Sequence, residues 1–215
     1  MYLTFQNSNF TEMKTFYFYF FLLFALQSCK EKSLPILGNY TIENNDTIFS
    51  KIPDFQLLTQ DSLEFNAQML DGKIHLAAFF FTSCPTICPK VMRNMMRIED
   101  KFSEQKDILY LCYSLDFKKD SIPRLKEYSN KLGIENANFL FLQGKQKEDI
   151  RSLMNAYMSI AVDDPDSPGG INHSGWILLV DKKRHLRSYC LGTDEKETDR
   201  LIKDIQILLD EVVKI

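Results

Sequence analysis

The chain has 215 residues, enough for one globular domain with a substantial core and too few for a second domain to be expected. Hydrophobic residues form 45% of the sequence and charged residues 26%, an ordinary balance for a globular protein. The net charge of -3 offers no basic field to the phosphates of nucleic acid. Nucleic acid is therefore excluded as a class of partner.

The N-terminal part of the chain has the pattern of an export signal. Residues 16–26, FYFYFFLLFAL, form an apolar run that is shorter than the roughly 20 residues of a membrane-spanning helix and typical of the central region of a signal peptide. Ser28 and Cys29 follow it. This Leu-x-small-Cys pattern resembles a bacterial lipobox, in which the cysteine is lipidated and becomes the first residue of the mature protein.

We therefore predict a lipoprotein signal peptide over residues 1–29, with Cys29 as the lipidation site. Met13 is a better start than the first Met because Lys14 then places a positive charge directly before the apolar run. The mature protein is expected to be a membrane-anchored lipoprotein that faces the periplasm; ordinary cleavage and a retained anchor are the alternatives. In such a compartment no glutathione pool keeps thiols reduced.

Residues 30–51 are polar, rich in Asn and without clear periodicity. They predict a flexible tether between the lipid anchor and the domain. The folded domain is expected to occupy residues 52–215.

Seven short apolar runs predict strands, at residues 55–59, 61–65, 74–81, 108–115, 138–142, 176–181 and 186–192. Four segments with apolar residues at helical spacing predict helices, at residues 87–103, 121–132, 146–160 and 195–213. Residues 163–174 predict a loop. Strands that alternate with helices, followed by a hairpin and a last helix, predict an α/β fold: a thioredoxin-like three-layer sandwich with a central mixed β-sheet flanked by helices.

Two cysteines, Cys84 and Cys88, follow an apolar strand in the stretch FFFTSCPTICPK, residues 79–90. A helix N-terminus favours the thiolate, which is both a nucleophile and a metal ligand. On a regular helix, residues four apart have Cβ atoms about 5–6 Å apart, whereas a disulfide needs about 3.8 Å. The spacing therefore favours a shared metal ion without excluding a redox pair. A purely structural disulfide would constrain little of the unfolded chain.

A metal ion held by two thiolates calls for a third ligand, and the sequence contains three histidines. His75 lies inside a predicted strand, where a structural role is expected, and His185 lies in a charged turn. His173 precedes an apolar strand in GGINHSGW. A strand antiparallel to its neighbour would bring this loop to the cysteine end of the sheet, and Gly169 and Gly170 give the loop freedom to close over the site.

These motifs resemble the Sco/SenC family of copper-binding assembly factors for cytochrome c oxidase. The family's C-x-x-x-C-P motif after an F-x-F-T-like strand is matched by FFFTSCPTICP. The family histidine follows the second cysteine by somewhat under a hundred residues and precedes an apolar strand that ends in Asp. His173 follows Cys88 by 85 residues and leads into WILLVD.

A third family block, S-h-D-P-x-x-D-T with h apolar, is matched in part by SLDFKKDS. This chain keeps Asp116 and Asp120 but has Phe117 and Ser121 in place of Pro and Thr. The likeness covers roughly residues 52–212, the whole predicted domain.

The resemblance implies that Cys84, Cys88 and His173 bind copper. It implies a metallochaperone that delivers copper to the apo copper-site subunit of cytochrome c oxidase. Two thiolates and one imidazole suit Cu(I), or Cu(II) with an added ligand, whereas zinc would want a fourth ligand.

The alternative function is that of a periplasmic thiol-disulfide reductase. In this function Cys84 and Cys88 are the catalytic cysteines and reduce the cysteines of the copper-site partner. A thiol reductant partner then reduces Cys84 and Cys88 again. Thioredoxins usually place a cis-proline where this chain has Asn172, His173 and Ser174, which favours the metal hypothesis. Peroxide chemistry is a third hypothesis, and whether the protein is an enzyme stays open.

The remaining candidate residues are expected to be structural. A helical methionine stripe, Met92, Met95 and Met96, predicts core packing rather than copper ligands. Cys112 and Cys190 lie in apolar strands and are expected to be buried bystanders. For Asp116 and Asp120, local capping of a loop is favoured over docking of a partner.

Overall fold

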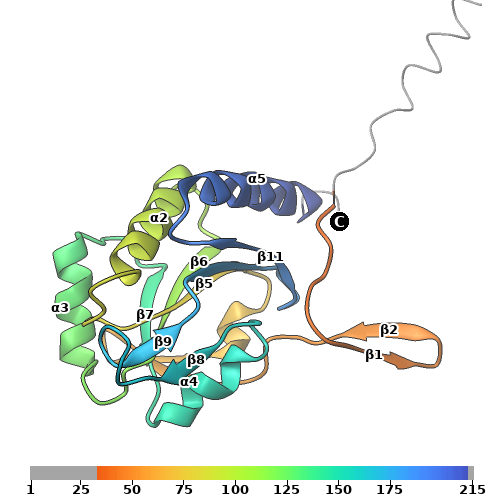
Figure 1. Ribbon diagram of the computed structural model, residues 1–215. Coiled ribbons are helices and arrows are strands. Elements are labelled where there is room, and N and C mark those ends of the chain that lie inside the picture. The colour runs from red at the N-terminus through yellow and green to blue at the C-terminus, as the bar shows by residue number, and fades with distance from the viewer. Residues whose placement is uncertain (1–32, 213–215) are drawn as a thin grey trace, which may run out of the picture. The chain divides into compact units, whose positions relative to one another are not determined.

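A seven-stranded mixed β-sheet forms the centre of the fold in the computed structural model, which describes residues 33–212 (Figure 1). Its strand order is β11-β10-β5-β6-β7-β3-β4. The strands are β3 (Gln56–Thr59), β4 (Glu64–Asn66), β5 (Ile74–Phe80), β6 (Ile108–Ser114), β7 (Phe139–Gln143), β10 (Trp176–Val180) and β11 (Leu186–Leu191). Strands β5, β6 and β7 are parallel, and the other neighbours pair antiparallel.

Helices cover both faces of this sheet. They are η1 (Ala67–Leu70), α2 (Cys88–Lys101), α3 (Ile122–Leu132), α4 (Lys147–Met154) and α5 (Glu195–Val212). All seven residues of β5 are buried, and alternate side chains enter different cores. Leu76 and Phe80 belong to the core shared with α2, α3 and α5, while Ala77 and Phe79 belong to the core shared with α4 and η1. The predicted three-layer α/β sandwich is thus confirmed.

Two regions in the C-terminal half of the chain differ from the predicted secondary structure. Helix α4 ends at Met154 rather than at residue 160, because the chain turns at Met158 (φ 50°) and carries Tyr157 into the core. The expected loop at 163–174 is partly regular, since β8 (Ala161–Asp163) pairs antiparallel with β9 (Ile171–His173). Sequence reasoning missed these strands because each has only three residues, too few for a period-two pattern.

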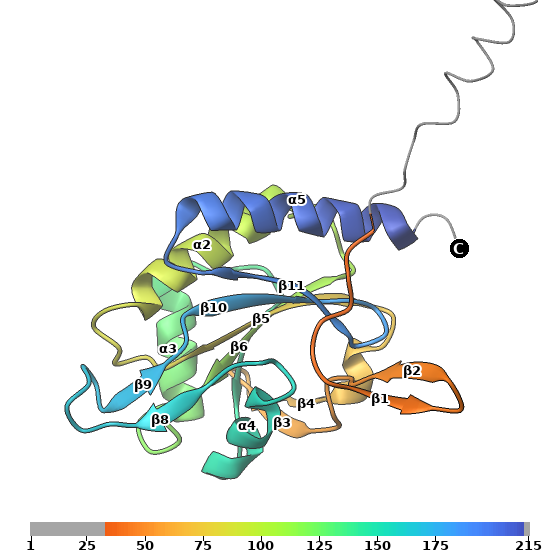
Figure 2. The same ribbon diagram turned by 45° about the vertical axis from the view of Figure 1, so that its right-hand side comes forward.

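Within the segment expected to be a flexible tether, residues 30–51, residues 40–49 have regular structure. Strand β1 (Tyr40–Glu43) pairs antiparallel with β2 (Asp46–Phe49) in a hairpin separate from the main sheet (Figure 2). Asn44 and Asn45 form its turn with φ of 51° and 67°, a left-handed conformation that Asn tolerates. The asparagines that suggested an unstructured segment therefore make the turn of a hairpin.

The predicted signal peptide and Cys29 lie outside the described residues. Within residues 33–212, no helix is long and apolar enough to cross a membrane.

Candidate metal centre

The two cysteines lie where β5 ends and α2 begins. Cys88 is the first residue of α2, and Pro89 occupies the first turn, where its missing N–H removes no helical hydrogen bond. Cys84 lies before the helix, in a turn closed by the hydrogen bond from its amide to the carbonyl of Phe81 (3.2 Å). The four-residue spacing is therefore spanned by a loop and not by one face of a regular helix.

His173 reaches the cysteines from the other side of the site. It is the last residue of β9, which leads into β10 beside β5. The ligand atoms of Cys84, Cys88 and His173 all lie within 4.8 Å of one another, and His173 Nε2 is 3.5 Å from Cys88 Sγ. The structure thus brings together the three residues that the sequence singled out.

One hydrogen bond decides how the His173 ring faces the sulfurs. Its Nδ1 lies 3.0 Å from the carbonyl oxygen of Ser174. Because a carbonyl only accepts, Nδ1 carries the proton and Nε2 keeps its lone pair, which points at Cys88. Burial lowers the pKa of His173, so the ring is neutral at pH 7. This is the form in which histidine binds a metal.

The two thiols differ in how readily they lose a proton. Burial raises the pKa of Cys84, but hydrogen bonds from the amides and side chains of Cys88 and Thr86 outweigh it, and the net pKa is lowered. Burial raises the pKa of Cys88 strongly, and the hydrogen bond to Cys84 and the charge of Asp120 raise it further. Cys84 is also the more accessible thiol, 8% exposed against 1% for Cys88. Cys84 is therefore the first thiolate, and all four described cysteines are free thiols.

Phe81 forms a wall of the site. Its ring lies edge-on to His173, with ring centroids 5.7 Å apart. Gly169, in the loop between β8 and β9, passes so close that a Cβ there would lie 2.5 Å from the Phe81 ring and 3.7 Å from Pro85. The loop that carries His173 can pack over the cysteine turn only with glycine at this position.

Asp120 ties the beginning of the cysteine turn to the end of β6. It is fully buried, and its carboxylate accepts hydrogen bonds from the Thr82 amide (3.0 Å), the Thr82 hydroxyl (2.5 Å) and the Ser114 hydroxyl (2.7 Å). Local capping, expected for both aspartates, holds only for Asp116, which accepts from the Lys119 amide (3.1 Å). The sequence flagged Asp120 but not its partner Thr82, which is distant in the chain.

The residues expected to be structural lie in the core. Cys112 and Cys190 are fully buried; the Cys112 thiol faces the Met92 sulfur at 3.7 Å, and Cys190 faces Thr198. Met92 and Met95 are fully buried and Met96 packs against the same core. His75 Nε2 lies 2.9 Å from the Tyr157 hydroxyl, and burial lowers the pKa of His75 to about 3.

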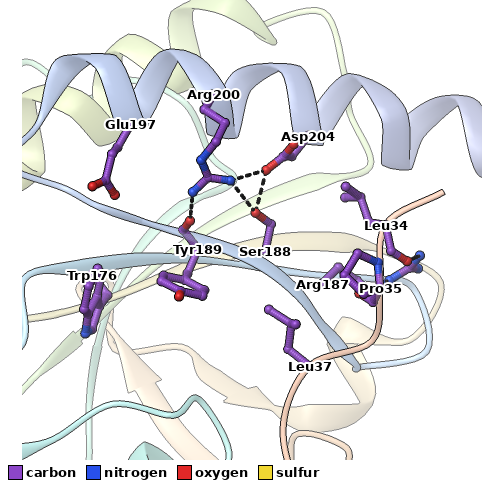
Figure 3. Close-up of a pocket in the computed structure, with 10 residues that line it drawn as sticks. All are labelled: Leu34, Pro35, Leu37, Trp176, Arg187, Ser188, Tyr189, Glu197, Arg200 and Asp204. Atoms are coloured by element: carbon purple, nitrogen blue, oxygen red, sulfur yellow. Dashed lines mark hydrogen bonds and ion pairs between the residues drawn. The ribbon is translucent and has the colours of Figure 1, made fainter. Parts of the chain in front are cut away.

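A hollow lined partly by charged side chains lies away from the cysteines and His173. It measures about 680 Å³ between α5, β11 and the segment around Leu34 (Figure 3). Its charged side chains are already satisfied within the protein: Arg200 bonds Asp204 (2.6 Å) and Glu197 accepts from the Leu191 amide (2.7 Å). Among the described residues, Cys84, Cys88 and His173 form the one group of His, Cys, Asp or Glu side chains placed to share a metal ion.

Fold and site together define a thioredoxin-like domain with a Cys₂His cluster at a strand–helix junction. The sequence model described as SCO1/SenC matches residues 44–210, and the chain belongs to this family. It is 30% identical over 188 residues to an SCO2-like protein of Rickettsia felis, a match covering 84% of this chain and 88% of that protein.

Two solved structures show the same fold. A SCO1/SenC family lipoprotein from Bacillus anthracis superposes with a TM-score of 0.67 at 26% identity, covering 74% of this chain and 95% of that one. Arabidopsis thaliana ScoI, solved with copper bound, superposes with a TM-score of 0.61 at 23% identity, covering 73% of this chain and 99% of that one.

We expect Gly169→Ala to displace the loop that carries His173. Gly169 (φ 87°) and Gly170 (φ 84°) share a left-handed backbone, so alanine at either costs roughly 1–2 kcal/mol of strain. Only at position 169 would the new Cβ meet the Phe81 ring; at 170 nothing lies within 4 Å. Thermal unfolding and metal titration should show a larger loss for Gly169→Ala than for its matched control Gly170→Ala. Equal losses would contradict the packing role of Gly169.

Asp120→Asn should loosen the cysteine turn. The asparagine amide has one oxygen that can accept and one NH₂ group that cannot. One of the buried donors on Thr82 or Ser114 therefore loses its partner, at a cost of about 1–3 kcal/mol. Urea unfolding should report this loss of stability, and a metal titration should show weaker binding. The control is Asp116→Asn, whose side-chain oxygen can still accept from the Lys119 amide, so it should cost less than about 1 kcal/mol. If the two variants were equally stable, Asp120 would not be the residue that fixes the turn.

Limiting iodoacetamide should label Cys84 before Cys88 in the reduced, metal-free protein. Thiolate is the reactive form. Because the pKa of Cys84 is lowered, its alkylation should begin at a lower pH than the alkylation of an ordinary thiol, whereas the raised pKa of Cys88 should protect Cys88. Peptide mass spectrometry across a pH series measures both. Thr86→Ala removes one hydrogen bond to Cys84 and should shift the onset to higher pH. Equal labelling of both cysteines at every pH would refute the asymmetry.

Proposed function

We propose that this protein is a metallochaperone that binds copper through Cys84, Cys88 and His173 and delivers it to the copper-site subunit of cytochrome c oxidase. The observation that carries the proposal is the convergence of two sulfurs and the Nε2 lone pair of His173 within 4.8 Å. A neutral histidine whose lone pair faces Cys88, with Cys84 within 4.8 Å, is arranged as a ligand.

The donor set favours copper over zinc. Two sulfurs and one imidazole are soft donors, and Cu(I) accepts low coordination numbers. Structural zinc sites take four ligands, and among the described residues the cluster offers no fourth His, Cys, Asp or Glu. Membership of the SCO1/SenC family and the copper-bound relative from Arabidopsis support the same ion.

Delivery would proceed by exchange of ligands. Copper is the cargo, and a thiolate of the client replaces one protein ligand at a time, so that the ion is never released into water. The accessible Cys84 is where the exchange begins, and each displaced thiolate takes up a proton. Cys88, buried and with a raised pKa, favours its protonated form once copper has left.

The proposed place of this exchange is the periplasmic face of a membrane, to which the protein is held by a lipid on Cys29. The apolar run before Ser28 and Cys29 supports the anchor. A periplasmic site also supplies the oxidising surroundings in which a copper-delivery or thiol-reducing partner is needed.

The asymmetry of the two thiols favours one second candidate, a thiol-disulfide reductase. The Cys84 thiolate would attack a disulfide of the client, forming a mixed disulfide and releasing one client thiolate. Cys88 would then displace the second client thiol and leave a Cys84–Cys88 disulfide, which a thiol reductant partner must reduce. In this exchange His173 would tune the pKa of the Cys88 thiol, whose Sγ lies 3.5 Å from Nε2. The donor set and the copper-bound relative support the metal hypothesis over this alternative.

Titration of the reduced, anaerobic protein with Cu(I) against a competing chelator separates the two functions. We expect one tightly bound equivalent, weakened by more than about 100-fold in Cys84→Ser and in Cys88→Ser, since each removes a direct ligand. His173→Ala should mainly weaken Cu(II) binding. Cys190→Ser, a thiol outside the cluster, is the matched control. Weak or superstoichiometric binding would contradict copper delivery and favour the reductase, whose next test is the Cys84–Cys88 reduction potential.

A further inference from the structure

The β1–β2 hairpin presents large apolar side chains to solvent. The pairs Tyr40–Phe49 and Ile42–Thr47 lie on one face of it, because cross-strand partners share a face. Tyr40 is 59% exposed and Ile42 is 69% exposed, and the rings of Tyr40 and Phe49 lie 6.0 Å apart. The acidic pair at the turn, Glu43–Asp46, belongs to the opposite face. The Tyr40–Ile42–Phe49 face is named here the apolar face: Tyr40 and Ile42 are exposed and Phe49 is half-buried, while the opposite face also exposes Ile48 (47%).

Lysines surround the base of this hairpin. Lys51 follows β2. The backbone amide of Ile52 donates to the carbonyl of Arg184, and that of Gly72 to the carbonyl of Lys182, so residues 51, 72–73 and 182–184 lie side by side. The lysines of these segments are Lys51, Lys73, Lys182 and Lys183. None of the ion pairs formed within residues 33–212 includes them.

The carboxylates beside these lysines are held by arginines. Arg184 binds Asp54 (2.7 Å) and Asp71 (3.3 Å), and Arg187 binds Asp181 (3.0 Å). Asp107, brought next to Lys73 by the hydrogen bond from the Ile74 amide to its carbonyl, adds one carboxylate that is unpaired within residues 33–212, so the four lysines leave a reduced excess of positive charge around the hairpin base.

The chain also enters the folded domain at this end. Arg187, which lies beside Leu34 and Pro35 in Figure 3, donates to the carbonyls of Leu34 (2.5 Å) and Pro35 (3.2 Å). The Leu34 amide donates to Glu211 (2.7 Å). Leu37 donates to the carbonyl of Leu186 at the start of β11 (2.8 Å). Leu34 follows Cys29 by five residues, which span at most about 18 Å when fully extended. A lipid on Cys29 would keep this end of the domain next to the bilayer.

From these observations we propose that the apolar face and the four lysines seat on the surface of an anionic lipid bilayer. Tyrosine and phenylalanine favour the interface between headgroups and acyl chains, and lysines near it are attracted to anionic headgroups. The lipid anchor attaches the protein, and the hairpin fixes the direction in which the domain faces. The inference rests on the proposed anchor at Cys29.

This seating turns the metal centre away from the membrane. Strand β5 begins at the hairpin end, where His75 pairs with Val180, and runs toward the cysteine turn. Its seven residues span about 23 Å. The views agree that the hairpin and β9, which carries His173, lie at opposite ends of the domain (Figures 1 and 2). A client must therefore present its copper site well above the bilayer surface.

Fluorescence quenching by brominated lipid tests the contact. The full-length lipidated protein carries Trp176→Phe, which removes its single tryptophan, together with Tyr40→Trp. The protein is added to vesicles of phosphatidylglycerol and phosphatidylcholine in which the acyl chains of the phosphatidylcholine are brominated. We expect at least about a twofold loss of emission relative to unbrominated vesicles, because an interfacial ring lies near the acyl chains. Thr41→Trp, on the opposite face, is the matched control and should lose little. Lys182→Gln with Lys183→Gln should reduce the quenching of Tyr40→Trp.

The outcomes separate this inference from the anchor on which it rests. If the protein stays with the vesicles but position 40 is not quenched, or is quenched no more than position 41, the seating of the hairpin is overturned and the anchor stands. A shift of emission without dependence on bromine points to a second protein copy on the apolar face, and also overturns it. If a carbonate wash strips the wild-type protein from membranes, the anchor and the seating fail together. The copper titration is independent of all three results.

Discussion

The position of β5 between a parallel and an antiparallel neighbour determines where the chemistry can be. The parallel pairing with β6 places the ends of both strands at one edge of the sheet, so Asp120 can accept hydrogen bonds both from Ser114 at the end of β6 and from Thr82 at the start of the cysteine turn. The antiparallel pairing with β10 makes the chain that enters β10 lie beside the chain that leaves β5. His173 therefore meets Cys88 although 85 residues separate them. A parallel β10 would have put the histidine at the other end.

Features that depend on local chemistry were predictable from sequence, and features that depend on distant contacts were not. The unbroken apolar run of β5, the Gly133 end of α3 (φ 69°) and the Cys–His set follow from residue type and spacing. The hydrogen bond that Asp120 accepts from the Thr82 amide joins two loops that only the folded sheet brings together. The passage of Gly169 over Phe81 is equally invisible in sequence, where the glycine indicates flexibility and not close packing.

Burial gives the centre its electrostatic character, and it does so with opposite effects on its members. Desolvation lowers the pKa of His173 and raises that of Cys88, because in each case it disfavours the charged form. Cys84 escapes this rule through hydrogen bonds that stabilise its thiolate. One thiolate, one thiol and one neutral imidazole can begin either metal binding or disulfide exchange. The thiols alone thus do not distinguish the two functions, and the Ser174 carbonyl, by leaving the Nε2 lone pair free toward Cys88, supports the proposed role as a metal site.

In the two proposals the ends of the sheet have separate tasks, and the largely buried Arg187 is one of the residues that tie the segment around Leu34 to the rest of the domain. Arg187 binds Asp181 in the turn after β10, Glu211 in α5 and the carbonyls of Leu34 and Pro35. Helix α5 also packs on β11 and contacts α2, which begins at Cys88. A rigid sheet and helix thus lie between the segment near the proposed anchor and the metal centre. Because these layers are close-packed, the orientation of the end that carries Leu34 sets the direction in which Cys84 faces.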